Sequence, residues 1–382
     1  MGNLPAPLAS VNAARAAALA ALACGVTGCA AGGGSVPREA LSDVREYLGT
    51  ASRAPAALER VDSAPATVWR TSAGRGTTGA PAVGDRVTAI ATVDRWVYAL
   101  DTRTGRVFWK FRGDGPYGAG PVMAGGRVFA ASEGREGKLT AIALASGKRR
   151  WQANVGDVGA PLAAGDSTVH GATQQGFAFA YRADNGRRLW TRAVGPTRSG
   201  PLLLGRYVVY ATLTDSLVVL DAGTGANVAR AALPVSTAAP LARLDDSTAL
   251  LASGSGRLVA AAVPSGRVRW QVETREPIYG APVVTQDTVF ALTNRCTLWV
   301  VPVATPARAT TEAIGCVSEA APTIVRGGVL VATVRGEVIY FDRGAGRVVW
   351  TRAVRGELRH PPSVRNGQIL VAPIFGPVVS FR

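Results

Sequence analysis

The stretch YALDTRTGRVFW, from Tyr98 to Trp109, joins an apolar run, an Asp, a Thr-Gly turn and a second run that ends in Trp. A single copy could be a cofactor-binding loop with a stacking Trp, or one unit of a structural repeat. The chain also holds five related stretches: TAIALASGKRRW, FAYRADNGRRLW, VVLDAGTGANVA, VAAAVPSGRVRW and IYFDRGAGRVVW. One cofactor needs only one such loop, so the copies favour a repeat.

A recurring proline sets the period of this repeat. It occurs as Pro81, Pro121, Pro161, Pro201, Pro240, Pro282, Pro322 and Pro362, at spacings of 40, 40, 40, 39, 42, 40 and 40 residues. Five of these prolines are followed, 28 to 30 residues later, by Trp109, Trp151, Trp190, Trp270 and Trp350. Ala229 and Thr310 occupy the same place in two further units, which therefore depart from the repeat.

Each unit of about 40 residues reads as four short strands separated by Gly, Asp, Asn and Ser turns. That combination is typical of a β-propeller blade. The last unit ends on PVVSFR (Pro377 to Arg382), a third strand, and ATVWRT (Ala66 to Thr71) reads as a fourth strand with no unit before it. The sequence thus predicts an all-β, eight-bladed propeller whose ring is closed by pairing its N-terminal and C-terminal strands.

The N-terminus predicts export and a lipid anchor. Arg15 is followed by the apolar stretch AAALAALACGVTGC, which is too short to span a bilayer well and reads as a secretion signal. Its end, VTGC, resembles the lipobox of bacterial lipoproteins, which implies cleavage before Cys29 and acylation of that residue. An ordinary signal with an incidental Cys is the alternative. The predicted organisation is a signal peptide over 1–28, a lipidated Cys and flexible tether over 29–65, and the propeller over 66–382.

The charge of the chain leaves several partner classes open. The 382 residues carry a formal net charge of +16, which can attract nucleic acid, anionic lipid or an acidic protein. No basic block with interleaved aromatic residues occurs, so we expect no nucleic-acid binding. The residue after the turn Gly is basic in five units, as Arg106, Lys148, Arg187, Arg267 and Arg347. This ring could face anionic lipid or an acidic partner, or could simply keep exposed turns soluble.

The units resemble the PQQ-like repeat, and a propeller of eight such units behind a lipobox looks like the BamB family. That family comprises non-catalytic lipoproteins of the machinery that assembles β-barrels in the outer membrane. The resemblance implies a monomer on the periplasmic side of the outer membrane. Its implied partners are the barrel-folding subunit (BamA-like) and nascent outer-membrane proteins.

The resemblance also points to one partner-binding residue. In the family an inter-blade loop carries a Leu-Arg pair, and the corresponding loop here is AVGPTRSGP, Ala193 to Pro201. Arg198 stands where the Arg would, but Thr197 replaces the Leu. The next such loop, LPVSTAAP (Leu233 to Pro240), lacks the acidic residues that the family places there. The alternative for Arg198 is a solvated loop arginine.

No pattern in the sequence predicts catalysis, a cofactor or a metal. The two histidines, His170 and His360, lack a supporting motif, and no metal-ligand spacing occurs. Two rival functions remain: an exported PQQ-like propeller that binds another protein or ligand, and a quinoprotein dehydrogenase-like enzyme. The latter would need a ring-stacking site, a metal site and a catalytic Asp.

Cys296 and Cys316 are the cysteines left after the expected processing. One falls between the second and third strands of its unit and the other in the connection to the next unit, and both positions lie on one face of a propeller. Because export favours oxidation, we expect a disulfide between them. A redox-active pair is the alternative.

Overall fold

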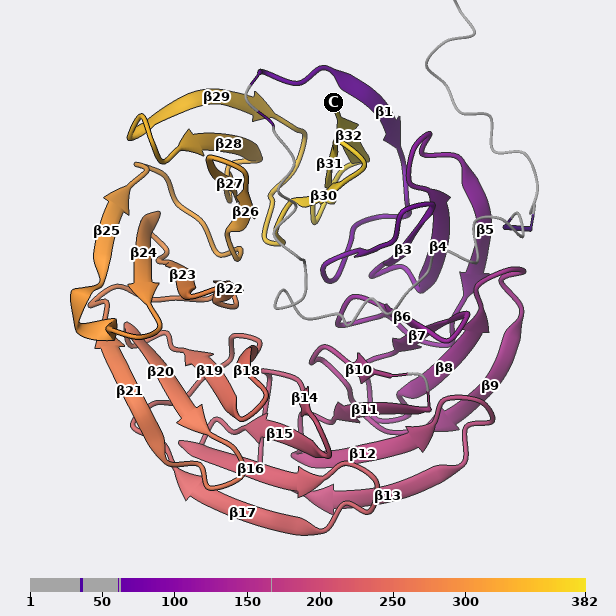
Figure 1. Ribbon diagram of the computed structural model, residues 1–382. Coiled ribbons are helices and arrows are strands. Elements are labelled where there is room, and N and C mark those ends of the chain that lie inside the picture. The colour runs from indigo at the N-terminus through magenta and orange to yellow at the C-terminus, as the bar shows by residue number, and fades with distance from the viewer. Residues whose placement is uncertain (1–34, 37–60, 62, 166) are drawn as a thin grey trace, which may run out of the picture. The chain divides into compact units, whose positions relative to one another are not determined.

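The computed structural model describes residues 35–36, 61, 63–165 and 167–382. These residues form eight four-stranded antiparallel sheets arranged as the blades of a ring, as Figure 1 shows. The predicted all-β, eight-bladed propeller is thus confirmed. The predicted signal peptide, Cys29 and most of the predicted tether lie outside the described residues.

Each blade is built from four strands, which in blades 1 to 7 run in chain order from the centre of the ring outward. Blades 1 to 4 comprise β2 (Ala82–Val83), β3 (Val87–Ala91), β4 (Trp96–Asp101) and β5 (Val107–Arg112); β6 (Val122–Ala124), β7 (Arg127–Ala131), β8 (Lys138–Ala143) and β9 (Arg149–Asn154); β10 (Ala163–Ala164), β11 (Thr168–Ala172), β12 (Phe177–Arg182) and β13 (Arg188–Ala193); and β14 (Leu202–Leu204), β15 (Tyr207–Ala211), β16 (Ser216–Asp221) and β17 (Asn227–Ala232).

Blades 5 to 8 repeat this plan. They comprise β18 (Ala242–Asp245), β19 (Thr248–Ala252), β20 (Arg257–Ala262) and β21 (Val268–Glu273); β22 (Val283–Thr285), β23 (Thr288–Leu292), β24 (Thr297–Pro302), the short 3-10 helix η2 (Pro306–Arg308) and β25 (Thr310–Ala313); β26 (Thr323–Val325), β27 (Gly328–Ala332), β28 (Glu337–Asp342) and β29 (Arg347–Ala353); and β30 (Ser363–Arg365), β31 (Gln368–Val371), β32 (Val378–Phe381) and β1 (Thr67–Thr71).

The ring closes through blade 8, in which β1 from the N-terminal end pairs with β32 from the C-terminal end. Beyond the paired strands, Ala66 and Arg382 exchange two backbone hydrogen bonds of 2.8 Å each. Joining the two ends in one sheet leaves no unpaired gap in the ring, and this protects the edges at which sheets otherwise associate. The predicted closure is confirmed.

The opening stretch YALDTRTGRVFW forms the outer hairpin of blade 1. Asp101 Oδ1 accepts the N–H groups of Arg103 and Thr104 at 2.9 and 3.0 Å, which caps the turn between β4 and β5. Gly105 then takes a φ of +70°, in the left-handed region that favours glycine. Its N–H closes the turn on the Asp101 carbonyl at 2.8 Å. The Asp-Thr-x-Thr-Gly pattern is therefore a turn-forming device.

The Trp of the outermost strand joins neighbouring blades. The indole N–H of Trp109 donates to the Leu144 carbonyl of blade 2 at 2.7 Å, and Trp151 donates to Ala183 of blade 3 at 2.9 Å. Trp69 and Trp190 make the same contact with the following blades. The turn Gly of the following blade lies flat against each of these indoles, where a Cβ atom would overlap the ring. The Trp and the next unit's Gly thus form one interaction.

In the two units without the Trp, other contacts fill the interface with the following blade. After Ala229, the turn glycine of blade 5, Gly266, packs against Ala231 instead of an indole. After Thr310, the place next to Gly346 is open, and Arg343 of blade 7 bridges to blade 6. Arg343 Nη2 lies 2.7 Å from Glu312 Oε1, and its guanidinium lies 4.9 Å from the ring of Phe290.

The contact between Trp and turn glycine predicts that the same substitution at two turn glycines lowers the free energy of unfolding by different amounts. Gly147 and Gly346 have similar φ values, +67° and +63°, so an Ala at either position suffers similar backbone strain. At Gly147, however, the new Cβ lies 2.7 Å from Trp109, whereas at Gly346 nothing lies within 4 Å. We expect Gly147→Ala to destabilise the protein by about 1–3 kcal/mol more than Gly346→Ala, because overpacking adds to strain.

Thermal or denaturant unfolding of both variants, followed by tryptophan fluorescence, measures this difference. Equal midpoints for the two variants would show that the indole does not constrain the turn.

Candidate functional site

Two kinds of loop meet on one face of the ring. Because the strands alternate in direction, the turns between second and third strands lie beside the connections that lead from one blade to the next. Backbone hydrogen bonds of 2.8 Å join them, from Leu213 to the Pro196 carbonyl, from Gln174 to Asp157 and from Asn294 to Pro277. We call this surface the loop face. The opposite surface, made by the first-to-second and third-to-fourth turns, is the turn face.

The exposed large apolar side chains are distributed unequally between these surfaces. Within the described chain, six lie on the loop face: Val93, Phe177, Leu213, Tyr279, Val317 and Phe375. Four more lie on the outermost strands: Val68, Val228, Val348 and Val349. The turn face presents none among its described residues. Phe375 is the most exposed of all, at 63%. Apolar groups held in water at one face indicate a surface that a partner covers.

The loop face is balanced in charge. Its turns and connections carry nine basic residues and nine acidic residues: Arg75, Arg95, Arg135, Arg198, Arg275, Arg295, Arg335, Arg355 and Arg359 against Asp94, Asp114, Glu133, Glu136, Asp157, Asp215, Glu276, Glu319 and Glu357. Mixed charge around dispersed apolar groups is the composition of a protein-binding surface, in which polar groups form a rim around apolar contacts.

A groove of about 620 Å³ runs from this face down between blades 2 and 3. Asp157 and Gln175 line it at the loop face, Phe177 and Tyr181 form its aromatic wall, and Arg188 of β13 lines it at the outermost strand. Exposed Phe177 thus belongs both to the loop face and to the groove.

Arg198 lies on the loop face between two anchored neighbours. Thr197 and Ser199 are both buried, and their hydroxyls donate to the Ala211 carbonyl at 2.6 and 3.1 Å. Arg198 itself is exposed, and its side chain makes no ion pair with another described residue. The backbone therefore holds Arg198 outward on a fixed loop.

Thr197, which stands where the family's Leu is expected, has a structural role that the sequence did not reveal. Thr237 and Ser318 occupy the same place in other inter-blade connections, and their hydroxyls bond to Ala252 and Ala332. The position is thus a recurring anchor that ties each connection to the next blade. In the sequence, a Thr or Ser recurs at these positions at multiples of about 40 residues, and this recurrence could have identified the anchor.

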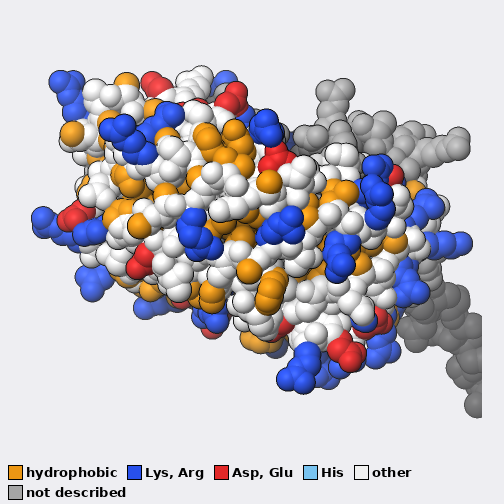
Figure 2. Space-filling model, turned by 90° about the horizontal axis from the view of Figure 1, so that it is seen from below, with side chains coloured by type: hydrophobic (Ala, Val, Ile, Leu, Met, Phe, Trp, Pro, Cys, Tyr) orange, Lys and Arg blue, Asp and Glu red, His pale blue; other side chains and the backbone are white. Residues whose placement is uncertain are grey.

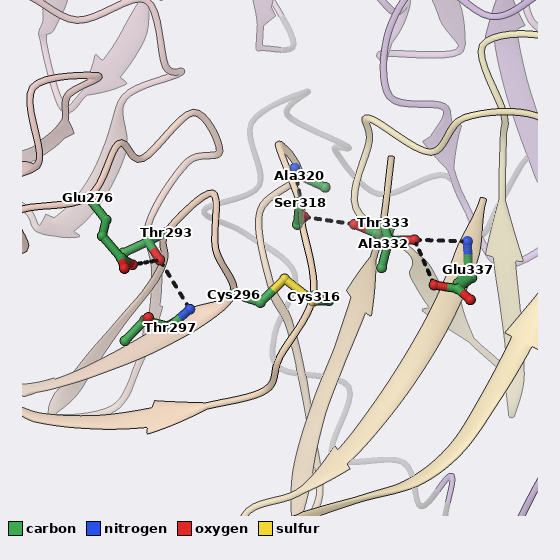
Figure 3. Close-up of a disulfide and its surroundings, with 10 residues drawn as sticks. All are labelled: Glu276, Thr293, Cys296, Thr297, Cys316, Ser318, Ala320, Ala332, Thr333 and Glu337. Carbon is green, nitrogen blue, oxygen red and sulfur yellow. Dashed lines mark hydrogen bonds between the residues drawn. A yellow bond between two sulfur atoms is a disulfide. The ribbon is translucent and has the colours of Figure 1, made fainter. Parts of the chain in front are cut away.

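The structure joins Cys296 and Cys316 by a disulfide on the loop face, as Figure 3 shows, with their Cα atoms 5.2 Å apart. Cys296 is fully buried in the turn between β23 and β24, and Cys316 lies in the connection from blade 6 to blade 7. Around the bond, the Ser318 hydroxyl donates to the Ala332 carbonyl at 2.7 Å, and the Thr297 N–H donates to Thr293. The bond therefore fixes a connection that is also anchored to blade 7.

The position of this disulfide matters because blade 6 lacks the Trp that secures other blades at their outer edge. Here the Arg343–Glu312 pair holds the outer edge, and the disulfide ties the connection at the loop face. Formation of this disulfide in an oxidising compartment stays a prediction.

Of the two histidines, His170 is fully buried and His360 is partly exposed. His170 is fully buried against Trp190, with ring centroids 5.7 Å apart, and burial lowers its pKa to about 4. Burial, with a smaller effect of Arg359, lowers the pKa of His360 to about 4 as well. Both imidazoles are thus neutral near pH 7. The described residues contain no group of three or more His, Cys, Asp or Glu side chains placed to hold a metal ion.

In the part of the chain that the structure describes, no helix is long and apolar enough to cross a membrane.

Comparison with known proteins agrees with this architecture. A family model described as outer membrane protein assembly factor BamB matches residues 56–157, 134–228, 213–305 and 296–379. The outer membrane protein assembly factor BamB of Burkholderia pseudomallei (strain K96243) is 27% identical over 245 residues, which are 62% of this chain and 56% of that protein. The chain therefore spans little more than half the length of this relative.

Solved structures share the fold at low identity. The crystal structure of BamB from Moraxella catarrhalis matches with a TM-score of 0.69 and 17% identity, over 84% of this chain and 100% of that one. Quinohemoprotein alcohol dehydrogenase ADHIIG from Pseudomonas putida HK5 matches with a TM-score of 0.63 and 13% identity, over 83% of this chain and 76% of that one.

The disulfide predicts a stability that depends on redox state. In the chain-entropy model, closing a loop between cysteines 20 residues apart stabilises by about 3 kcal/mol. We expect the oxidised protein to have no reactive thiol at Cys296 or Cys316, and reductant to lower its unfolding midpoint. The Cys296→Ala/Cys316→Ala variant should start at the lower midpoint and not respond to reductant. Two titratable thiols in the exported protein would contradict the prediction.

Proposed function

This chain belongs to the family of the outer membrane protein assembly factor BamB, and from that premise we propose that it is a non-catalytic scaffold of outer-membrane β-barrel assembly. In this proposal the chain is exported under a signal peptide over residues 1–28. It is acylated at Cys29 and held by lipid on the periplasmic side of the outer membrane. The tether of 29–65 then leads to the propeller of 66–382.

The proposed partner is the barrel-folding subunit (BamA-like), bound through the loop face, together with nascent outer-membrane proteins. The observation that carries this proposal is the gathering of exposed apolar side chains on that face, with none on the described turn face. Such residues cost free energy in water, and a partner that covers them recovers it. Arg198, held outward on an anchored loop, would add a charged contact.

A non-catalytic role is also supported by the chemistry of the described residues. The His170 side chain is fully buried, so it offers no accessible general base, and the Nε2 atom of the partly exposed His360 is shielded from solvent. The recurring Trp is accounted for by its contact with the next blade. The quinohemoprotein alcohol dehydrogenases share the propeller fold. Addition of pyrroloquinoline quinone and Ca²⁺, followed by absorbance, would reveal such an activity in this chain.

The interface predicts which exposed apolar residues matter. Leu213→Ser/Phe375→Ser removes two apolar groups from the loop face, and Val348→Ser/Val349→Ser removes two from an outermost strand. We expect the first variant to lose about 2 kcal/mol of binding to the barrel-folding subunit, roughly thirtyfold in affinity, and the second to bind like the wild type. Affinity for the purified subunit and recovery from solubilised envelope measure both.

Arg198→Ala should weaken the same complex, while Arg347→Ala on the turn face serves as its matched control. Recovery of the wild-type chain without any barrel-folding subunit would overturn the proposal. Equal affinity of all four variants would exclude the loop face as the interface.

A further inference from the structure

The turn face, which the proposed function leaves unused, has an excess of positive charge. Its described turns carry ten basic residues against four acidic ones: Arg86, Arg103, Arg106, Lys148, Arg187, Arg206, Arg267, Arg308, Arg326 and Arg343 against Asp85, Asp184, Asp246 and Asp287. The loop face, by contrast, is balanced. The two ends of the ring therefore differ both in charge and in exposed apolar groups.

Five cations form a repeated set at the turn face, which we call the basic ring. Arg106, Lys148, Arg187 and Arg267 lie in its turns, and Arg347 is the first residue of β29, directly after such a turn. Each follows the turn glycine of its blade, each is exposed, and none makes an ion pair with another described residue. They come from blades 1, 2, 3, 5 and 7, so they are spread around the ring. Unpaired cations on several blades suit an extended anionic surface better than one small ligand.

Figure 2 views the molecule along its side, at the edge of Figure 1 that carries β13 and β17. Basic side chains outnumber acidic ones there too, so the positive charge continues from the turns onto the outer wall.

The N-terminal segment reaches the body at this same face. The Val36 N–H donates to the Ala145 carbonyl at 2.7 Å, in the turn between β8 and β9 of blade 2. The Val36 side chain is only 4% exposed and packs in the cluster that includes Trp109 and Leu144. The chain is thus held to the turn face seven residues after Cys29. Seven residues span at most about 25 Å when fully extended.

We propose that the turn face lies against an anionic phospholipid surface, with the basic ring in contact with lipid headgroups. This inference rests on the proposed acylation of Cys29, which would place the membrane within reach of Val36. Each basic residue near an anionic membrane strengthens binding roughly fivefold. Their attraction acts over a Debye length of about 8 Å, so the contact needs the membrane close to the turn face, and the seven residues from Cys29 to Val36 allow this. The loop face then points away from the membrane, where a partner can reach it.

The test measures energy transfer from a donor dye on the protein to acceptor dyes on lipid headgroups. The full acylated chain is bound to vesicles and carries the donor dye on one face at a time. Ala226→Cys lies in an exposed turn of the turn face, and Gln175→Cys lies in an exposed turn of the loop face. In vesicles containing phosphatidylglycerol we expect energy transfer from position 226 to exceed that from 175 roughly twofold or more. The difference should shrink in phosphatidylcholine alone or at high salt.

Two variants of equal net charge separate a specific face from bulk charge. The turn-face variant changes Arg106, Lys148, Arg187, Arg267 and Arg347 to Gln. The loop-face variant changes Arg95, Arg135, Arg198, Arg295 and Arg335 to Gln. Only the turn-face variant should lose the preference for position 226. Equal transfer from the two positions in wild type, or equal loss in both variants, would overturn the proposal. If energy transfer from position 226 still exceeds that from 175 in the turn-face variant, the basic ring does not bind lipid headgroups. An acidic protein would then be the remaining ligand of the basic ring.

The mass of the N-terminal peptide reports acylation of Cys29 separately. If Cys29 is not acylated, the lipid anchor in the proposed function is wrong. Flotation of the unacylated chain with phosphatidylglycerol vesicles then decides the membrane contact by itself. Loss of flotation in the turn-face variant but not in the loop-face variant supports the contact, and absence of flotation in wild type overturns it.

Discussion

The contact between an outer-strand Trp and the turn glycine of the following blade is the interaction on which this ring depends. The indole needs a flat surface, and only a residue without a Cβ offers one at this distance. Its N–H also satisfies a carbonyl at the end of the neighbouring third strand. The Trp side chain therefore sets the spacing of neighbouring blades, satisfies a backbone carbonyl and excludes water from the interface between the blades.

Blade 8 shows how strict this requirement is. There the third strand, β32, pairs with β1 from the N-terminal end, and among the described residues no third-to-fourth turn of this blade accepts the Trp350 indole N–H. The Val61 carbonyl takes that role at 2.9 Å, and Arg352 donates to the Pro65 carbonyl close by. The N-terminal approach to the ring thus replaces the missing turn, and it does so before β1 completes the sheet. Where Trp is absent, at Ala229 and Thr310, a small side chain or an ion pair fills the interface instead.

A ring secured at its outer edge leaves its two faces free to differ. Connections on the loop face are long and are tied down by buried hydroxyls such as that of Thr197, so residues between the anchors can vary without loosening the blades. Exposed apolar groups gather there. The turns of the opposite face are short, apart from the one in blade 6 that contains η2, and positive charge accumulates on them. The two faces would serve different surroundings, a protein on one side and a membrane on the other.

The fold follows from the sequence alone, because the period near 40 residues and the split last blade show in local patterns of apolar runs and turns. The sequence also marked Ala229 and Thr310 as departures, and it placed Cys296 and Cys316 on one face. What these signals do in the molecule became visible only in the folded ring. It showed that Trp and Gly from different units form one contact, that Thr197 is an anchor, and that Val36 packs on blade 2. Such facts join residues far apart along the chain, and no local pattern encodes which surfaces they bring together.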